Sequence, residues 1–450
     1  MFKNTSKISI SKIAVIIIFI SLIMTSFNIK RWKQCTIIQH DVYIYYSYLP
    51  ATFIYKDLSF KYIDTIPKDD NYEFRYVQCA SGGRIQKMTM GMAFVYAPFF
   101  LIAHYFSELV GLQTDGYTQL YQFALAMGAL IYSLLGLILL RKILLCFFNE
   151  FATTLTLISI YAGTNLLYYI TNESAMAHCY NFTLFTVVIY YTLKWYKKQE
   201  IKYAAIIGFS SGLITLIRPT NIIILLVPLL FGVVNFKGII DNLKLFYKHK
   251  YQILLAAGLF ILIIAPQLIF WKMASGQWFY YSYSNEKLEF ANPHIIEGLF
   301  GFRKGLFIYT PIIALAFIGI FFMLNRKSKL SKFTILLISF NVINIYIVLS
   351  WWNWWYGGSF GQRAFIESFA LLAIPMADLY QWFSAKKIVL KLSLIIIVLA
   401  FVFLNCFQII QYSRNIIHWD SMTKEAYKAV FLKLKKPANL DNLLKEPKAD

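Results

Sequence analysis

Long apolar runs separated by short basic stretches set the pattern of this chain and predict an all-α, polytopic membrane protein. Residues 8–27 form an apolar run of about 20 residues, which as a helix would span roughly 30 Å of hydrocarbon. Together with it, further predicted spans make about eleven crossings. They lie at residues 120–140, 151–170, 179–193, 203–217, 221–234, 253–270, 306–324, 333–350, 365–382 and 388–407.

One apolar segment, residues 88–106, does not fit this alternation. It contains Pro98 and His104. Counting it as a crossing would place the basic stretches 141–142, 194–198 and 326–329 all outside, against the cytoplasmic bias of Lys and Arg. We therefore expect it to lie along the outer interface or to re-enter the membrane, so that every strongly basic short loop is cytoplasmic.

This topology divides the chain into a membrane module and a tail. Lys3, Lys7 and Lys12 place the first terminus in the cytoplasm, and no small-residue cleavage site follows the first run, which predicts an uncleaved span. The module covers residues 1–410, and 411–450 form a basic tail whose side is open. The extracytoplasmic parts are predicted at residues 28–118, 171–177, 272–305 and 351–363.

Composition agrees with a bilayer environment. Hydrophobic residues make up 59% of the 450 residues, charged residues 14% and aromatics 18%, which excludes a disordered protein, a disulfide-stapled mini-domain and an ordinary soluble globule. A net charge of +21 would suggest nucleic acid in a soluble protein, but here the basic residues flank apolar runs as topology anchors. We expect no nucleic-acid partner. Cys35 and Cys79 share the first loop, where a disulfide and two free thiols are both open.

The first candidate for chemistry is Asp41, which stands among aromatic side chains just beyond the first span, with Tyr45 one helical turn on. Partial burial raises the basicity of a carboxylate, and a nearby cation can hold it in position, as a general base requires. A solvated loop carboxylate above an aromatic belt is the alternative, and both interpretations are open at this point.

Cations on the same predicted side form a second group. An outward excess of Lys and Arg beside glycines runs against the insertion bias and suggests an anionic ligand, most simply a phosphate; lipid headgroups are the alternative. Glu367 stands four residues after Arg363, a helical spacing that would let it orient the guanidinium. The candidate cations are Lys87, Arg218, Arg303, Lys304 and Arg363.

A short predicted outer turn carries Glu173 and His178. Together with Asp41 they are candidates to bind an acceptor or a divalent cation, Mg or Mn. A His that is merely hydrogen-bonded is the simpler alternative.

The order of these elements resembles the C-type fold of integral-membrane glycosyltransferases that use lipid-phosphate sugars, in the branch of the protein O-mannosyltransferases and lipid A aminoarabinose transferases. The stretch His40-Asp41-Val42-Tyr43 is similar to that family's first-loop acidic motif, with Val42 where a second acid often stands. Gln86-Lys87-Met88-Thr89-Met90-Gly91 resembles its Lys-Tyr-Pro-x-Gly pattern, with Thr89 in place of Pro. The segments 271–278, 305–311 and 357–363 resemble a bacterial subgroup, and the likeness covers about residues 1–410.

The resemblance implies a single-sugar transferase of the bacterial inner membrane with an extracytoplasmic site and interfacial helices in the first loop. Asp41 would act as the base or orienting carboxylate, and Lys87 would bind the phosphate of a polyprenyl-phosphate sugar donor. Glu173 or His178 would take the place of an acidic residue that arranges acceptor or metal. The acceptor would be a hydroxyl of a glycan, lipid or protein. A transporter or flippase of a lipid-linked saccharide is the alternative, and a polysaccharide polymerase or ligase is a third possibility.

Overall fold

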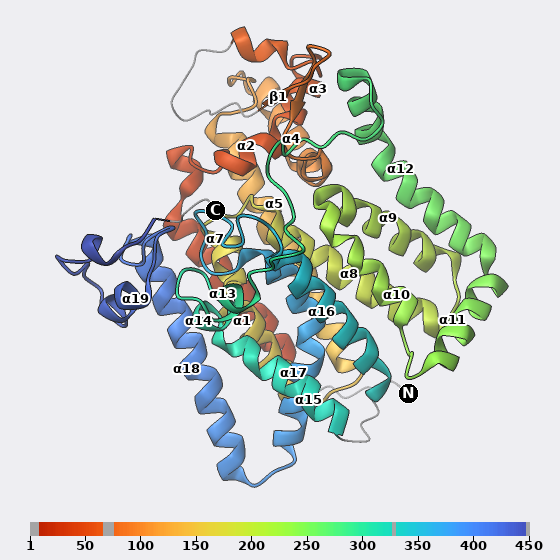
Figure 1. Ribbon diagram of the computed structural model, residues 1–450, viewed down its shortest axis with the longest axis vertical. Helices are drawn as coiled ribbons and strands as arrows, with labels where there is room; N and C mark the ends of the chain where they lie inside the picture. Colours follow the sequence, from red (N-terminus) through yellow and green to blue (C-terminus); the bar gives the residue numbers. More distant parts are fainter. Residues whose placement is uncertain (1–8, 66–75, 326–329, 447–450) are drawn as a thin grey trace.

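The structure is a computed structural model that describes residues 9–65, 76–325 and 330–446, and this part of the chain is built almost wholly of helices (Figure 1). The longer helices are α1 (Ile10–Ile29), α4 (Gly91–Leu109), α5 (Gln119–Leu145), α6 (Glu150–Ala162), α8 (Ala177–Lys197), α9 (Ile201–Ile217), α11 (Phe236–Lys248), α12 (Lys250–Ser275), α15 (Ala314–Asn325), α16 (Thr334–Leu349), α17 (Phe369–Ser384) and α18 (Ile388–Ser413). The short α-helices are α2 (His40–Tyr46), α3 (Tyr48–Phe53), α7 (Leu166–Thr171), α10 (Leu226–Leu230), α13 (Ile295–Phe300), α14 (Leu306–Tyr309) and α19 (Lys424–Val430).

Short 3-10 helices and one small hairpin complete the described chain. The 3-10 helices are η1 (Arg31–Gln34), η2 (Lys61–Thr65), η3 (Pro219–Leu225), η4 (Pro311–Ile313), η5 (Ser331–Phe333), η6 (Arg363–Ser368) and η7 (Asp441–Leu443). The strands β1 (Tyr76–Gln78) and β2 (Arg84–Gln86) pair antiparallel, with Val77 opposite Ile85.

The all-α prediction is confirmed, but the count of eleven spans is wrong. Five helices in the described ranges are long and apolar enough to cross a membrane, namely α1, α4, α5, α12 and α18. Helices α9, α15 and α16 are apolar but shorter. Helix α8 has the length, but polar side chains lower its hydropathy, and Asn181, Thr183, Thr186 and Thr192 among them are buried inside the bundle.

The remaining predicted spans are interrupted because their backbone breaks. The run 151–170 divides at Gly163, where the last turn of α6 closes, and α7 restarts at Leu166. The run 306–324 divides at Pro311, which cannot donate the backbone hydrogen bond that would continue α14. Periodic apolarity therefore located these segments correctly but overstated their continuity.

Helix α4 covers the segment 88–106, which we expected not to cross. Its length and composition pass the same test as the spanning helices, and Pro98 lies inside it without ending it. Its two ends contact two different helices of the bundle. Its first residue, Gly91, lies against Ile217 at the end of α9, and near its other end His104 Nδ1 lies 2.7 Å from Tyr121 Oη at the start of α5.

Helix α4 therefore packs across one end of the bundle, which we call the site end: the end where α5 and α8 begin and α9 finishes. At the opposite end, Ser9 and the backbone N–H of Ser11 donate to Glu150 at 2.8 and 2.9 Å. Arg141 at the end of α5 donates there to Ser11 at 2.7 Å. In Figure 1 the segments of the first loop, α2, α3 and β1, gather at the top of the molecule with α4.

Small residues bring α9 and α12 together. A side chain at Gly208 would lie 2.2 Å from the backbone oxygen of Ala256, and one at Gly212 would lie 2.9 Å from that of Phe260. Two glycines four residues apart on one helix face let two backbones approach closely, a common packing device where lipid surrounds both helices. This contact carries α12 and the loop that follows it to the site.

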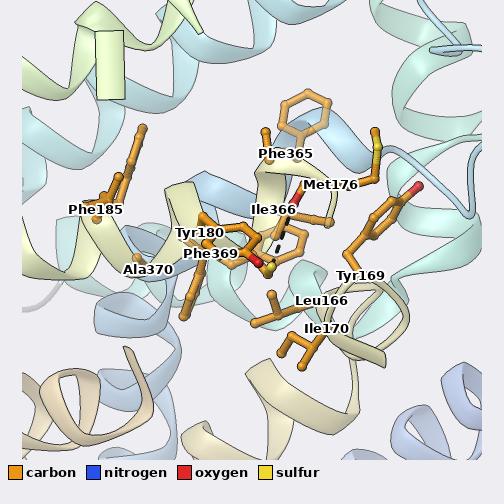
Figure 2. Packing of buried hydrophobic residues seen from close by; sticks show 14 of the residues in the cluster. Leu166, Tyr169, Ile170, Met176, Tyr180, Phe185, Phe365, Ile366, Phe369 and Ala370 are labelled. Atoms are coloured by element: carbon orange, nitrogen blue, oxygen red, sulfur yellow. Dashed lines mark hydrogen bonds between the residues drawn. The ribbon is translucent and has the colours of Figure 1, made fainter. Parts of the chain in front are cut away.

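Beneath the site end lies an aromatic core. Figure 2 shows side chains of α7, α8, η6 and α17 pointing toward one another, among them Leu166, Tyr180, Phe365 and Phe369. All four are 2% exposed or less. Burial of such large side chains fixes η6, the element that begins with Arg363, against α8.

The α9–α12 contact predicts different effects for two equivalent substitutions. Gly208→Ala should destabilise the protein by about 2 kcal/mol because the new methyl group meets the α12 backbone. Gly258→Ala, on α12 with nothing within 4 Å of its Cβ, is the matched control and should leave stability unchanged or slightly higher. Thermal unfolding in detergent measures both, and equal midpoints for the two variants would contradict this packing.

Candidate functional site

An ion pair between Asp41 and Arg363 lies at the centre of the site end. Arg363 Nη2 donates to Asp41 Oδ2 at 3.1 Å, and the Arg363 side chain is only 17% exposed and that of Asp41 25%. The residues are 322 positions apart in the chain. The structure therefore brings together two of the site residues that the sequence had placed in separate groups.

The loop before Arg363 is fixed by hydrogen bonds from several elements. Asn165 donates to the carbonyl oxygen of Phe360 at 3.1 Å, and the Phe360 N–H donates to Tyr169 Oη at 3.2 Å. Gly361 adopts a positive φ of 62°, and a Cβ there would lie 3.0 Å from that of Tyr309. The glycine-rich sequence thus serves a tight turn that aims Arg363 at Asp41.

Asp41, the other partner of the ion pair, is positioned by α2 and by the turn before this helix. Gln122 of α5 accepts hydrogen bonds from the backbone N–H groups of Ile37 and Ile38 at 2.8 and 3.3 Å. His40 has a φ of 49°, an uncommon conformation for a residue with a side chain, and Asp41 follows in the first turn of α2. Tertiary contacts therefore fix the position of Asp41, which does not lie on a free loop.

A second charged group lies beside the first. Glu367, which is 2% exposed, receives contacts from His178 at 3.1 Å and from Arg218 at 3.7 Å. Its second oxygen, Oε2, is buried and has no hydrogen-bond partner. The Arg218 guanidinium also stacks over the ring of Tyr356, 5.1 Å from its centroid. Arg218 is thus part of a largely buried network with Glu367 and Tyr356.

The expected pairing of Glu367 with Arg363 is not present. Both residues lie in η6, a 3-10 helix with about three residues per turn, so positions four apart face different directions. Arg363 points to Asp41 and Glu367 points to His178 and Arg218. The α-helical spacing assumed from the sequence gave the wrong partner.

Lys87 forms a third charged group. Its ammonium lies 2.5 Å from Glu286 and 5.4 Å from the ring centroid of Tyr283. Tyr283 is in turn within electrostatic reach of Asp41 and Arg218, and Tyr45 is within reach of Asp41, Arg218 and Arg363. The two tyrosines are therefore close to charged residues of all three groups, which lie in one region of the site end.

Charge within this site is balanced. The three cations Lys87, Arg218 and Arg363 each contact one carboxylate. A partly buried charge without a counter-charge lowers the stability of the fold, so each carboxylate stabilises the cation that it contacts. An entering anion would have to compete with these carboxylates for the cations.

Lys304 and Arg303 make contacts that hold the C-terminal segment instead. Lys304 is 1% exposed, and its ammonium donates to the backbone oxygens of Ser359 and Trp419. Arg303 donates to the backbone oxygens of Asp420 and Lys445 at 3.3 and 3.0 Å. The tail therefore packs on the site end, next to the loop that carries Arg363.

Glu173 and His178 have different ion-pair partners. Glu173 pairs with Arg31 at 2.7 Å, and Arg31 also donates to the carbonyl oxygen of Thr36. Among residues 9–65, 76–325 and 330–446, no three His, Cys, Asp or Glu side chains come together as ligands for a metal ion. Cys35 and Cys79 are free thiols and form no disulfide.

Sequence reasoning missed several functional side chains. Glu286, Tyr283 and Asn165 contact or support the site, yet none stands in a motif or at a diagnostic spacing. Only their nearness to charged residues in the folded chain identifies them.

A scan of protein-family models, a search of curated proteins and a search of solved structures found no match to this chain.

The buried network around Glu367 predicts strong coupling between Arg218 and Glu367. Glu367→Gln should lower stability by about 3 kcal/mol because it leaves the Arg218 charge without its counter-charge. Adding Arg218→Met should recover much of that loss, since the unpaired charge is then gone. Unfolding midpoints of the two single variants and the double variant measure the coupling, and strictly additive losses would refute it.

Lys304 predicts a pH-dependent stability. Burial is the main cause that lowers the pKa of the Lys304 amine from 10.5 to about 7. The nearby charges of Arg363 and Arg303 also lower this pKa, whereas Asp420 raises it. The unfolded state therefore binds more protons between about pH 7 and 10.5, so this residue makes the folded state more stable as pH rises through that range.

The difference in unfolding free energy between wild type and Lys304→Met should increase from pH 7 to pH 9, by at most about 1.4 kcal/mol per pH unit. Melting curves at three pH values measure it. Lys287→Met, at a side chain that is 72% exposed, is the control and should show no such trend. A difference that is constant or falls with pH would show that Lys304 stays charged when folded.

Proposed function

We propose that this protein transfers a single sugar from a polyprenyl-phosphate donor to an acceptor hydroxyl. The observation that supports this most is the contact of Asp41 with Arg363, with Arg218 and Lys87 in the same site. Inverting glycosyl transfer from a lipid phosphate needs a carboxylate for the acceptor and cations for the leaving phosphate. These groups occupy one end of a bundle whose long helices are apolar enough for lipid.

In this proposal the donor phosphate takes the place of Asp41 on Arg363. A phosphodiester and a carboxylate each carry one negative charge and compete for the same two-pronged guanidinium, and the lipid phosphate gains further charge once the sugar has left. Binding would release the Asp41 carboxylate into a partly buried, aromatic environment, where its basicity is higher. The donor thus converts a neutralised ion pair into a bound anion and a free base.

The released Asp41 accepts the proton of the acceptor hydroxyl as its oxygen attacks the anomeric carbon. The bond from that carbon to the phosphate oxygen breaks on the opposite face, and the electron pair remains on the lipid phosphate. Arg363 and Arg218 stabilise the developing negative charge. Glu367 is a positioning residue because it holds Arg218, and His178 is one because it holds Glu367; neither touches the reacting atoms.

The membrane setting of the proposal follows from the placement of charge. The stretch 194–198 and Lys142 lie at the end opposite the site, as expected if that end is cytoplasmic and the site extracytoplasmic. Helix α4 lies across the site end, which fits an interfacial element of the C-type fold. A bacterial inner membrane, with polyprenyl phosphates as sugar carriers, would provide this arrangement.

Two variants separate the roles of the ion pair. Asp41→Asn should lower turnover at least 100-fold, as for loss of a general base, while donor affinity stays equal or rises because Arg363 is no longer neutralised. Arg363→Ala should weaken donor binding and turnover together. The measurements are transfer of label from radiolabelled polyprenyl-phosphate sugars and equilibrium binding of the donor, both with purified protein.

The matched control is Asp64→Asn, which removes a carboxylate that also pairs with an arginine, Arg84, at 2.6 Å but is 57% exposed. Asp64→Asn should leave both the transfer of label and the binding of the donor unchanged. Full transfer by a correctly folded Asp41→Asn variant would refute the role of Asp41. Absence of transfer with every donor, with movement of a lipid-linked saccharide across vesicle membranes, would favour the flippase instead.

A further inference from the structure

Helix α11 has three distinct faces, none of which is fully buried. Phe236, Ile240, Leu243 and Tyr247 are exposed and follow the helical spacing of a single stripe. A neighbouring stripe carries the exposed lysines Lys237, Lys244 and Lys248, with the exposed Asp241 between the first two, and keeps a net positive charge. On the third side, Asn242, Leu245 and Phe246 are half-buried against the bundle.

The orientation of α11 is fixed by contacts on its third face. Asn242 donates to the backbone oxygens of Leu229 and Phe231, each at 3.0 Å. The Phe246 ring lies 5.9 Å from that of Trp195, which is buried at the end of α8. Asn235 caps the helix by accepting from the Gly238 N–H at 3.1 Å. These contacts therefore fix the helix so that its apolar stripe faces away from the bundle.

The surroundings of α11 are those of a membrane boundary. It leads directly into α12, a candidate spanning helix that begins at Lys250 and is largely exposed along its length. It lies at the end opposite the site, where Lys142 and Lys194 both approach the ring of Tyr190. In Figure 1 α11 is seen at the lower right, far from α2 and α3.

We propose that α11 lies in the membrane interface and that Lys237, Lys244 and Lys248 bind anionic phospholipid headgroups. The apolar stripe faces the acyl chains, the third face contacts the protein, and the lysine stripe lies at the depth of the phosphates. The occupant is lipid because a spanning helix continues directly from this segment and because three lysines on one stripe complement a negatively charged surface. The site is separate from the proposed sugar transfer and does not depend on it.

Neighbouring spin labels test the placement of the helix. A nitroxide is attached to Leu243→Cys or to Lys244→Cys, in protein whose exposed Cys146 is replaced by Ser, in nanodiscs of neutral and anionic phospholipid. The label at 243 should collide mainly with oxygen, which concentrates in acyl chains, and the label at 244 mainly with a water-soluble nickel complex. Two labels equally open to nickel would overturn the proposal, as would a label at 243 shielded from both because a second protein chain covers it.

Headgroup binding is tested by the shift in unfolding temperature when phosphatidylglycerol replaces part of the phosphatidylcholine in the nanodiscs. Wild type should be stabilised, and the triple variant Lys237→Gln, Lys244→Gln and Lys248→Gln should lose most of that shift, with about fivefold weaker headgroup binding per lysine. The control replaces exposed Lys424, Lys433 and Lys435 at the site end, removes the same charge, and should keep the shift. A full shift in the α11 variant would overturn the proposal.

Discussion

The ion pair between Asp41 and Arg363 is the contact on which the arrangement of the site depends, because it joins the first loop to an element near the end of the membrane module. Neither charge is well solvated, so each needs the other, and the elements that carry them must be rigid. That requirement explains the hydrogen bonds from Gln122 behind α2 and from Asn165 and Tyr169 around the Arg363 loop. The same pair defines the proposed chemistry, since an entering phosphate must break it.

The molecule has two chemically different ends. The site end gathers balanced charges among tyrosines, covered by α4 and by the C-terminal segment that Lys304 and Arg303 hold in place. The opposite end carries exposed lysines, such as those of α11, beside apolar side chains. Basic residues are common at the ends of membrane-spanning helices, and charged residues that are buried within such proteins are usually paired.

Much of the fold class could be predicted from the sequence, because apolar runs and basic loops are local signals. Asp41, Lys87, Arg218 and Arg363 were found by their charge on one predicted side, and the structure links them into one site. The number of full-length spans could not be found this way, since apolar composition does not reveal where the backbone breaks, as at Gly163 and Pro311. The partners of Glu367 and Lys87 depend on long-range packing and on a 3-10 helix, which sequence spacing does not show.

In the proposed mechanism a lipid-linked phosphate replaces Asp41 on Arg363. An experimental structure of the protein in nanodiscs with a polyprenyl-phosphonate sugar, which cannot be cleaved, tests it most directly. The account predicts the phosphonate bound to Arg363 and Arg218, with the Asp41 carboxylate beyond hydrogen-bond distance of Arg363 and facing the anomeric carbon. A phosphonate bound elsewhere, with the Asp41–Arg363 pair intact, would contradict it.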